Sequence, residues 1–279
     1  TVKERGITLA NTLNHAVTQL NDIINDLNYR VSVKVNEINS IARQISQLNL
    51  QIQQTEVGGA SAADLKDKRD LLLDKLSNLV QFESYEDENG IFTVNVGGAI
   101  LVKGPDSANM EFDTSVANGK VVWKEYRSDV RLLKGELKGI IELRDDKIQK
   151  YIDQLDTFTK VFVEEFNKIH AKGFNLEGIN GINFFEYTGG VLSVNPDIVS
   201  NPSKIAAAED ANGIPSDNRI ALELADFRNK IISIGGRNCT IDEYYGALVS
   251  KIGVDSQEAT RAADSQAFMV SQLNERRQM

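Results

Sequence analysis

Acidic and basic side chains crowd the stretch SAADLKDKRDLLLDKLS, residues 61–77. Four aspartates, two lysines and an arginine fall between Asp64 and Asp74. Carboxylates and amines gathered in this way could serve as general acids and bases. Asp67 and Asp70 lie one helical turn apart, but no His, Ser or Cys nucleophile accompanies them. The stretch therefore lacks the partners that an active site of this kind would need.

The same charges suit the outer face of a helix. They form two i,i+4 pairs, each of which contributes only about 0.2–0.5 kcal/mol on an exposed helix. These pairs are Asp64 with Lys68 and Lys66 with Asp70. Ser61 is placed to cap the helix. Its apolar face consists of Leu65, Leu72, Leu76 and Leu79. We therefore interpret the charged cluster as a solvated helix face.

No other residues have the spacing of a catalytic or metal-binding site. Cys239 is the only cysteine, so the chain has no disulfide framework and no thiolate metal cluster. His15 and His170 lie far apart, without a partner at ligand spacing. The glycine-rich turn after Gly173 lacks the spaced acids of a calcium loop, and no phosphate-binding glycine motif occurs. The sequence predicts no catalytic, cofactor-binding or metal-binding residue and no cofactor.

Composition narrows the class of protein further. The chain has 279 residues, 41% of them hydrophobic and 25% charged, which is enough for one or two domains with sizeable cores. Its formal net charge of -9 disfavours a nucleic-acid partner, which would require clustered Lys and Arg. No apolar run approaches the roughly 20 residues that span a bilayer, so we expect no membrane partner. No cleavable signal peptide is present either.

The elements that position these residues begin with a long helix over residues 10–54. Apolar residues recur there every seven positions in two series, with Lys34 as the polar exception, and neither Pro nor Gly interrupts them. The pattern predicts a seam that packs on another helix of this chain, on a neighbouring subunit, or on both. The two series are Val17, Ile24, Val31, Ile38, Ile45, Ile52 and Leu13, Leu20, Leu27, Ile41, Leu48.

Strands follow in the next part of the chain. Alternating residues around Asn89-Gly90 and again around Asn118-Gly119 predict two hairpins. The segments AILVKG and MEFD have strand character as well. We therefore predict a small antiparallel β domain over residues 81–134, with Trp123 in its packing.

Helical periodicity returns over residues 136–172, where an aromatic and aliphatic stripe predicts a core-facing helix that Gly173 ends. Three of the four prolines fall in residues 191–216, which predicts short elements and loops. A helix is expected to begin near Asp217.

Two helices are predicted in the last part of the chain. Thr240 and Glu243 have the spacing of a capping box for a helix that we expect Gly253 to close. A final helix, 255–278, has a smaller seam for packing within the chain or between subunits. This seam comprises Ala259, Ala262, Ala263, Met269 and Leu273.

Six blocks occur in a recognisable order along the chain. They are EINSIARQISQLNLQI, GGASAADLKDKRDLLLDKLSNLV, NVGGAILVKG, KGELKGIIELRDDKIQKYIDQLDTFTKVFVEEFNKIHAKG, GINGINFF and DEYYGALVSKIG. Together they resemble the bacterial flagellar hook-associated proteins of the hook–filament junction, specifically the first hook-associated protein family. The resemblance covers essentially the whole chain. The combination of DLKDKRDLLLDKLS with GELKGIIELRD is more specific than any single helical repeat.

The resemblance implies a secreted structural protein of the flagellar axis, exported unfolded by the flagellum's own type III route. It implies an inner helical domain made from both arms of the chain, an outer β-rich domain inserted between them, and no catalytic residues to carry over. Family members also have terminal helices that line the axial core. Because this chain starts at Thr1 and stops within a helical pattern, we interpret it as a core fragment without both terminal segments.

Pattern and resemblance together predict an α+β multidomain protein. It is a coiled-coil-like bundle of long helices from both arms, residues 1–80 and 135–279, with the β domain 81–134 inserted. The expected function is that of a non-enzymatic, extracellular adaptor that joins hook to filament by self-assembly and helix packing. The expected partners are its own copies in a ring, the hook subunit, the neighbouring junction protein, and an export chaperone that binds a terminal segment outside this chain. Two alternatives stay open, a flagellin-like filament subunit and a non-flagellar coiled-coil scaffold.

Overall fold

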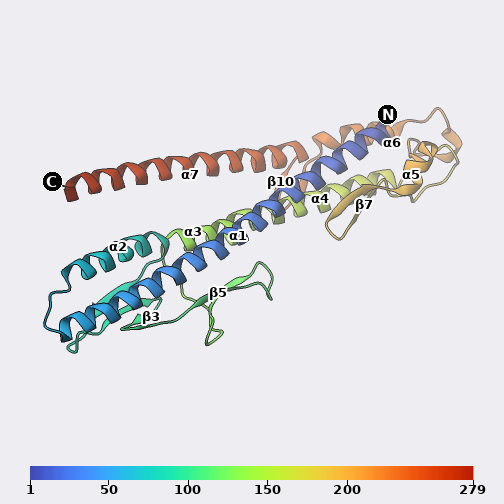
Figure 1. The fold of residues 1–279 in the computed structure, drawn as a ribbon. Helices are drawn as coiled ribbons and strands as arrows, with labels where there is room; N and C mark the ends of the chain where they lie inside the picture. Colours follow the sequence, from blue (N-terminus) through green and yellow to red (C-terminus); the bar gives the residue numbers. More distant parts are fainter. Residues whose placement is uncertain (279) are drawn as a thin grey trace. The chain divides into compact units, whose positions relative to one another are not determined.

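The fold is described from a computed structural model of residues 1–278, including the side chains of all but 274, 277 and 278. The chain forms two compact units, which we call the terminal unit (residues 1–18 and 151 onward) and the middle unit (residues 19–150). Long helices from both arms and small antiparallel sheets between them make up the fold (Figure 1). The predicted α+β class is confirmed. The predicted division into residues 1–80, 81–134 and 135–279 stays a prediction.

Helix α1 (Val2–Val57) follows the seven-residue repeat that the sequence shows. Most members of its seam are buried, because they pack against the rest of the chain. The exception, Lys34, has its Nζ 3.0 Å from a carboxylate oxygen of Glu136 and 3.2 Å from one of Glu37. The polar position of the seam therefore links the two helical arms. The buried seam residues are Leu13, Ile24, Leu27, Val31, Ile38, Ile41, Ile45 and Ile52.

Helix α2 (Ala63–Leu79) departs from two sequence predictions. Ser61 does not cap it, because the helix begins two residues later and no side chain caps its first turn. Neither predicted i,i+4 pair is present, since Asp64 does not pair with Lys68 and Lys66 does not pair with Asp70. The Nζ of Lys66 lies 2.7 Å from a carboxylate oxygen of Glu56 at the end of α1, so a partner on another helix replaces the one on its own helix.

The strands of the middle unit confirm both Asn-Gly hairpins. A four-stranded antiparallel sheet has the order β1-β2-β3-β4, and β5 pairs with β6. Asn118 and Gly119 both adopt left-handed backbone angles, with φ of 61° and 67°, as a turn between twisted strands requires. Trp123 is buried, as predicted. The strands are β1 (Glu83–Glu86), β2 (Phe92–Val96), β3 (Ala99–Lys103), β4 (Asp106–Ser107), β5 (Met110–Asp113) and β6 (Lys120–Trp123).

The helix predicted over residues 136–172 is confirmed, with an interruption that periodicity does not reveal. It consists of α3 (Glu136–Glu142), the π-helical segment η1 (Leu143–Ile148) and α4 (Gln149–His170). The wider turns of η1 leave Arg144 and Ile148 buried. Before α3, Gly135 has φ of 104°, and a Cβ there would lie 2.5 Å from the carbonyl oxygen of Leu79. Only glycine permits this close approach of the two helix ends.

The terminal unit has an aromatic core. Phe158, Phe162 and Phe166 of α4 pack against rings from later elements, and Tyr244 stacks on Phe158 with 5.9 Å between ring centroids. The aromatic stripe is therefore core, as predicted. Two hairpins pack in this unit. They are β7 (Phe185–Thr188) with β8 (Val191–Val194), and β9 (Ile232–Ile234) with β10 (Arg237–Cys239).

Short elements fill the proline-rich part of the chain, as predicted. Asn195, Asn201 and Asp210 each accept a hydrogen bond from the backbone N–H two residues on, which starts the next turn. The helix expected near Asp217 begins two residues later. The elements are α5 (Pro196–Ser200), η2 (Pro202–Lys204), η3 (Ala211–Gly213), α6 (Arg219–Asp226) and η4 (Phe227–Asn229).

Helix α7 (Ile241–Gln278) confirms one sequence prediction and corrects another. The capping box is present, since Glu243 accepts from the Thr240 backbone N–H at 2.8 Å and donates its own N–H to Thr240 Oγ1 at 3.2 Å. Gly253, however, does not end the helix. An interior glycine costs only about 1 kcal/mol relative to alanine, which does not stop a helix without a further break. The small-residue seam over 259–273 is exposed in this chain.

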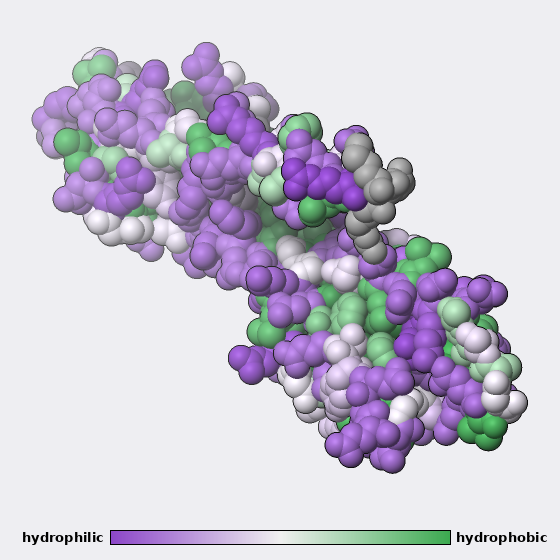
Figure 2. Space-filling model, turned by 90° about the vertical axis from the view of Figure 1, so that its left-hand side faces the viewer, coloured by the Kyte–Doolittle hydropathy of each residue, from purple (hydrophilic) through white to green (hydrophobic). Residues whose placement is uncertain are grey.

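Hydrophilic residues cover most of the face seen in Figure 2, with hydrophobic residues in smaller areas between them. Within the described part of the chain, every helix is too short or too polar to cross a lipid bilayer.

Candidate functional site

The aspartates of the charged stretch 61–77 are exposed, whereas one of its basic residues is buried. Asp64, Asp67 and Asp70 all lie on the surface of α2. Arg69, in the middle of the same stretch, is buried. Nothing in the sequence around Arg69 indicates its burial, because an arginine within a charged run is normally solvated.

The remaining candidates for chemistry have structural surroundings. His170 is buried. Its Nδ1 lies 2.7 Å from the carbonyl oxygen of Ile182, and its Nε2 accepts from the Ala206 backbone N–H at 3.0 Å. Both ring nitrogens are thus used to hold two loops. Cys239 is half-buried as a free thiol at the end of β10. Among the described residues, no three His, Cys, Asp or Glu side chains are grouped to hold a metal ion.

Arg69 fastens the four-stranded sheet to the two helices beside it. Its guanidinium lies 3.8 Å from the centroid of the Phe92 ring, and Nη1 donates to Asn49 Oδ1 at 3.2 Å. The Asn49 amide in turn donates to the carbonyl oxygen of Gly104 at 2.9 Å. Glu86 of β1 faces Arg69 at 3.7 Å. One buried cation therefore contacts α1, β1 and β2.

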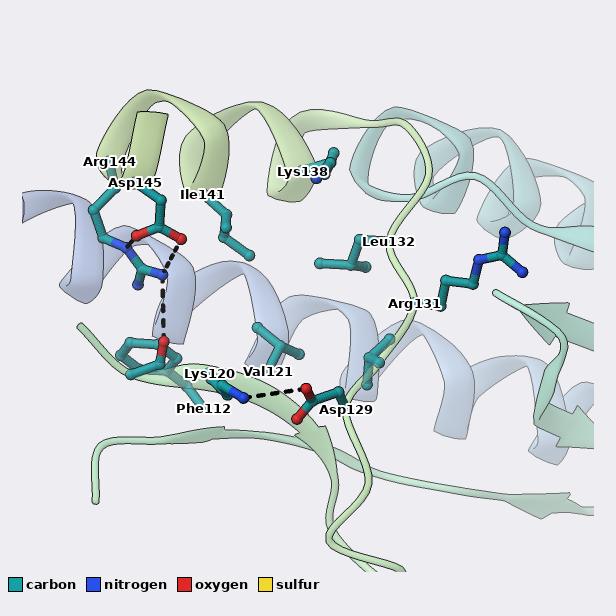
Figure 3. Close-up of a pocket in the computed structure, with 12 residues that line it drawn as sticks. Phe112, Lys120, Val121, Asp129, Arg131, Leu132, Lys138, Ile141, Arg144 and Asp145 are labelled. Atoms are coloured by element: carbon teal, nitrogen blue, oxygen red, sulfur yellow. Dashed lines mark hydrogen bonds and ion pairs between the residues drawn. The ribbon is translucent and has the colours of Figure 1, made fainter. Parts of the chain in front are cut away.

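Arg144 plays the same part for the second hairpin. Asp145 accepts from its Nε at 2.8 Å and from Nη2 at 2.9 Å, a two-point ion pair. Nη1 donates to Asn28 Oδ1 of α1 at 2.7 Å, and Nη2 also reaches the Gly119 carbonyl oxygen at 3.3 Å. Figure 3 shows Arg144 and Asp145 projecting from the helix toward the strand below. Because Arg144 is buried, these contacts tie η1, α1 and the β5–β6 turn together.

Asparagine side chains on the helices hold the edges of strands. Asn39 of α1 accepts from the Met110 backbone N–H at 2.8 Å and donates to the carbonyl oxygen of the same residue at 2.8 Å. Asn14 makes the same two bonds with Leu192 of β8, at 2.9 and 2.8 Å. In both cases a carboxamide replaces the two hydrogen bonds that a neighbouring strand would make.

A third asparagine works in the same way from the other arm. Asn167 of α4 accepts from the backbone N–H groups of Phe184 and Phe185 and donates to the carbonyl oxygen of Phe185. Hairpin β7–β8 is thus held by α4 at one strand and by α1 at the other. We call the contacts of Asn14, Asn39 and Asn167 the asparagine clasps.

These contacts offset the modest helix propensity of the asparagines that make them. An internal asparagine lowers helix stability by up to about 0.7 kcal/mol relative to alanine. Each clasp supplies hydrogen bonds of about 0.5–1.5 kcal/mol net, and without them buried backbone groups would be unsatisfied at about 1–3 kcal/mol each. Sequence reasoning missed the clasps because the strand that each asparagine contacts lies 18 to 178 residues away along the chain.

A shallow hollow of about 310 Å³ lies beside Arg144, between α3 and the β5–β6 hairpin. Ile141, Leu132 and Val121 point toward one another inside it (Figure 3). Lys120 and Lys138 lie at its rim, where the Nζ of Lys120 is 3.3 Å from Asp129. Its floor is apolar and its edges are charged.

The fold and these contacts define an α+β class of protein in which long helices hold small β elements by buried arginines and asparagine clasps. Residues 1–185 match the family described as "Flagellar hook-associated protein FlgK helical domain". The chain belongs to this family, whose members are structural proteins of the extracellular flagellum and not enzymes.

Individual relatives agree with this assignment. The chain is 27% identical over 319 aligned positions to flagellar hook-associated protein 1 of Bacillus subtilis, covering 99% of this chain and 62% of that protein. It is 29% identical to the protein of the same name in Salmonella typhimurium, covering 63% of this chain and 34% of the relative. The structure of the flagellar hook junction protein FlgK from Burkholderia pseudomallei is similar with a TM-score of 0.57 and 26% identity, over 65% of this chain and 35% of that one. The chain thus spans between 34% and 62% of the length of these relatives.

Proposed function

We propose that this chain is the body of an adaptor subunit that joins the flagellar hook to the filament. The observation that carries the proposal is the family match over residues 1–185, which includes α1, α2, both sheets of the middle unit and α4. The proposed partners are copies of the same protein in a ring, the hook subunit on one side and the neighbouring junction protein on the other. An export chaperone that binds a terminal segment belongs to the same proposal.

The proposed mechanism is mechanical. Helix α1 presents a long apolar seam with one polar position, Lys34, and buried side chains stabilise the seam by about 1.5–3 kcal/mol each. Arg69 and Arg144 attach the β elements to that helix through hydrogen bonds and ring contacts at several points. These non-covalent contacts support a rigid subunit in which helices and strands move together. An adaptor that transmits force from hook to filament requires such rigidity.

A replacement experiment tests the proposal. The corresponding region of the junction protein of a flagellated bacterium is exchanged for this chain, with the host's own terminal segments kept. We expect immunogold label at the hook–filament boundary and restored swimming. Cells without the protein should shed filaments and keep intact hooks. Label along the whole filament would instead support a filament subunit, and cytoplasmic label would support a scaffold of another kind.

A further inference from the structure

The four-stranded sheet of the middle unit ends in an open edge at β1. This strand pairs with β2 on one side only, and all four of its residues are exposed. Just beyond it, the Asp87 backbone N–H donates to the Ile91 carbonyl oxygen at 3.1 Å, which makes these two residues a hydrogen-bonded pair. Such pairs alternate with non-bonded ones along an antiparallel ladder. The backbone N–H and C=O groups of Ser84 and Glu86 therefore point away from β2, toward the edge.

These edge groups of β1 have no partner within the part of the chain that the structure describes. Neither a strand nor a side chain bonds to the backbone of Ser84 or Glu86 from that side. Other edges of the molecule are covered. The asparagine clasps occupy outward backbone groups of β5, β7 and β8, and residues 128–130 pair with the outer side of β6. The open edge of β1 is therefore a departure from how this chain treats its strands.

The open edge is also acidic. Residues 83–88 are ESYEDE, with four carboxylates and no base. Among the described residues, Glu86 is the only one of the four acids with an ion-pair partner, Arg69 at 3.7 Å. Lys103 of β3 is separated from β1 by the whole of β2. Two such edges would bring like charges together, so the charge disfavours a second copy and favours a basic strand.

We propose that β1 receives an extended, lysine- or arginine-rich segment of a different protein, which lengthens the sheet by one strand. The backbone of that segment bonds to the outward groups of Ser84 and Glu86. Because side chains alternate along a strand, its basic residues lie beside Glu83 and Tyr85, and its apolar residues lie beside Ser84 on the face that carries Val94. The inference goes beyond the proposed function, since assembly of copies in a ring does not require this edge.

Two substitutions of Ser84 separate edge pairing from general attraction to an acidic chain. The Ser84 backbone N–H points away from β2, so Ser84→Pro removes an edge donor without removing a bond of the ladder, and proline is tolerated at such positions. Ser84→Ala keeps the N–H group and is the matched control. The wild-type chain and both variants have the same net charge, so nonspecific attraction of a cationic peptide is equal in all three.

Fluorescence polarisation measures binding of a short labelled peptide of alternating lysine and valine to the purified chain. We expect saturable binding to the wild-type chain and to Ser84→Ala alike. Binding to Ser84→Pro should be about tenfold weaker or more, because hydrogen bonds at the edge are lost. A peptide in which glutamate replaces lysine should also bind the wild-type chain about tenfold more weakly or worse, because like charges then face each other. Circular dichroism verifies that both variants fold.

Amide exchange of the wild-type chain, followed by NMR, tests the contact without any substitution. Addition of the lysine peptide should slow exchange at Ser84 and Glu86. Unchanged exchange at both amides, or undiminished binding to a folded Ser84→Pro protein, would overturn the edge as the binding site. Equal binding of the lysine and glutamate peptides would overturn the basic partner.

Sedimentation of the wild-type chain addresses a second copy as the occupant of the edge. We expect the wild-type chain and Ser84→Pro to sediment alike. A dimer that Ser84→Pro converts to a monomer would identify a second copy at the edge and overturn the proposal. All of these measurements use the purified chain, so their failure leaves the proposed function, which the replacement experiment tests, unaffected.

Discussion

Buried polar side chains in this protein serve as joints between helix and strand. Asn39 illustrates the principle, because it satisfies the N–H and the C=O of Met110 at once. Arg144 extends it, since one guanidinium contacts a helix, a turn and a carboxylate. A buried charge or amide is costly unless its hydrogen bonds are made, so each joint also specifies one arrangement of the elements around it.

Replacement of Asn39 by alanine should destabilise the middle unit. The change leaves two buried backbone groups of Met110 unsatisfied, so we expect the free energy of unfolding to fall by about 2–4 kcal/mol. Asn36→Ala is the matched control, because Asn36 is exposed on the same helix and alanine has the higher helix propensity. Urea unfolding followed by circular dichroism measures both. Equal effects of the two substitutions would refute the role of the clasp.

His170 should make stability depend on pH. Burial lowers the pKa of its imidazole below the ordinary 6.5, although the hydrogen bond to Ile182 acts in the opposite direction. Below pH 6.5 the unfolded chain therefore binds a proton that the folded chain does not, and the free energy of unfolding falls as the pH drops. Between pH 7.0 and 5.5 the slope contributed by this group is at most about 1.4 kcal/mol per pH unit.

The variant His170→Gln tests this dependence, because glutamine does not titrate. Thermal melts between pH 7.0 and 5.5 should lose most of their pH dependence in His170→Gln and keep it in His15→Gln. A slope unchanged by His170→Gln would mean that other groups cause the acid sensitivity.

At the scale of elements, long periodic segments were predictable and the details of their ends and interruptions were not. The seven-residue repeat predicts α1 because one buried face outweighs the weak propensity of its asparagines. Asn118-Gly119 predicts a hairpin because the turn needs two left-handed residues. The π-helical segment at Leu143–Ile148 has no such local signal in the sequence, and it contains Arg144, whose partner Asn28 lies far away along the chain. Helix α7 likewise continues through Gly253, although a glycine after a helical pattern is a common local signal for the end of a helix.

The joints themselves could not be predicted from local pattern. Arg69 has the sequence neighbours of a surface residue, and its burial depends on Phe92 and Asn49 in other elements. The clasps join residues far apart in the chain, so nothing in the neighbourhood of Asn14 or Asn39 indicates a strand partner.

The apolar seam of α1 yields a prediction at this scale. Ile38 is fully buried at 0% exposure, whereas Ile23 on the same helix is 42% exposed. Ile38→Asp places an unpaired carboxylate in the core and should unfold the helices of the middle unit. Ile23→Asp should leave circular dichroism and melting temperature nearly unchanged. A folded Ile38→Asp protein would show that this part of α1 can leave the core without loss of structure.

At the scale of the whole molecule, the two units have separate sets of joints. Asn39, Asn49, Arg69 and Arg144 act within residues 19–150, while Asn14, Asn167 and His170 act within residues 1–18 and 151 onward. Each unit also has its own core, built on the aliphatic seam in the middle unit and on stacked aromatic rings in the terminal unit. Separate cores and separate joints are the conditions under which parts of a chain open independently.

Hydrogen exchange can therefore distinguish the two units. Asn39→Ala removes a joint of the middle unit and should speed amide exchange in β5 and β6, while protection of β7 and β8 stays as it was. Asn14→Ala removes the clasp on Leu192 and should have the reverse effect, because the lost hydrogen bonds lie in the other unit. Mass spectrometry of peptides from both hairpins measures the two responses in one experiment. If either substitution raised exchange equally in both units, α1 would transmit local opening along its length, and the chain would unfold as one cooperative body.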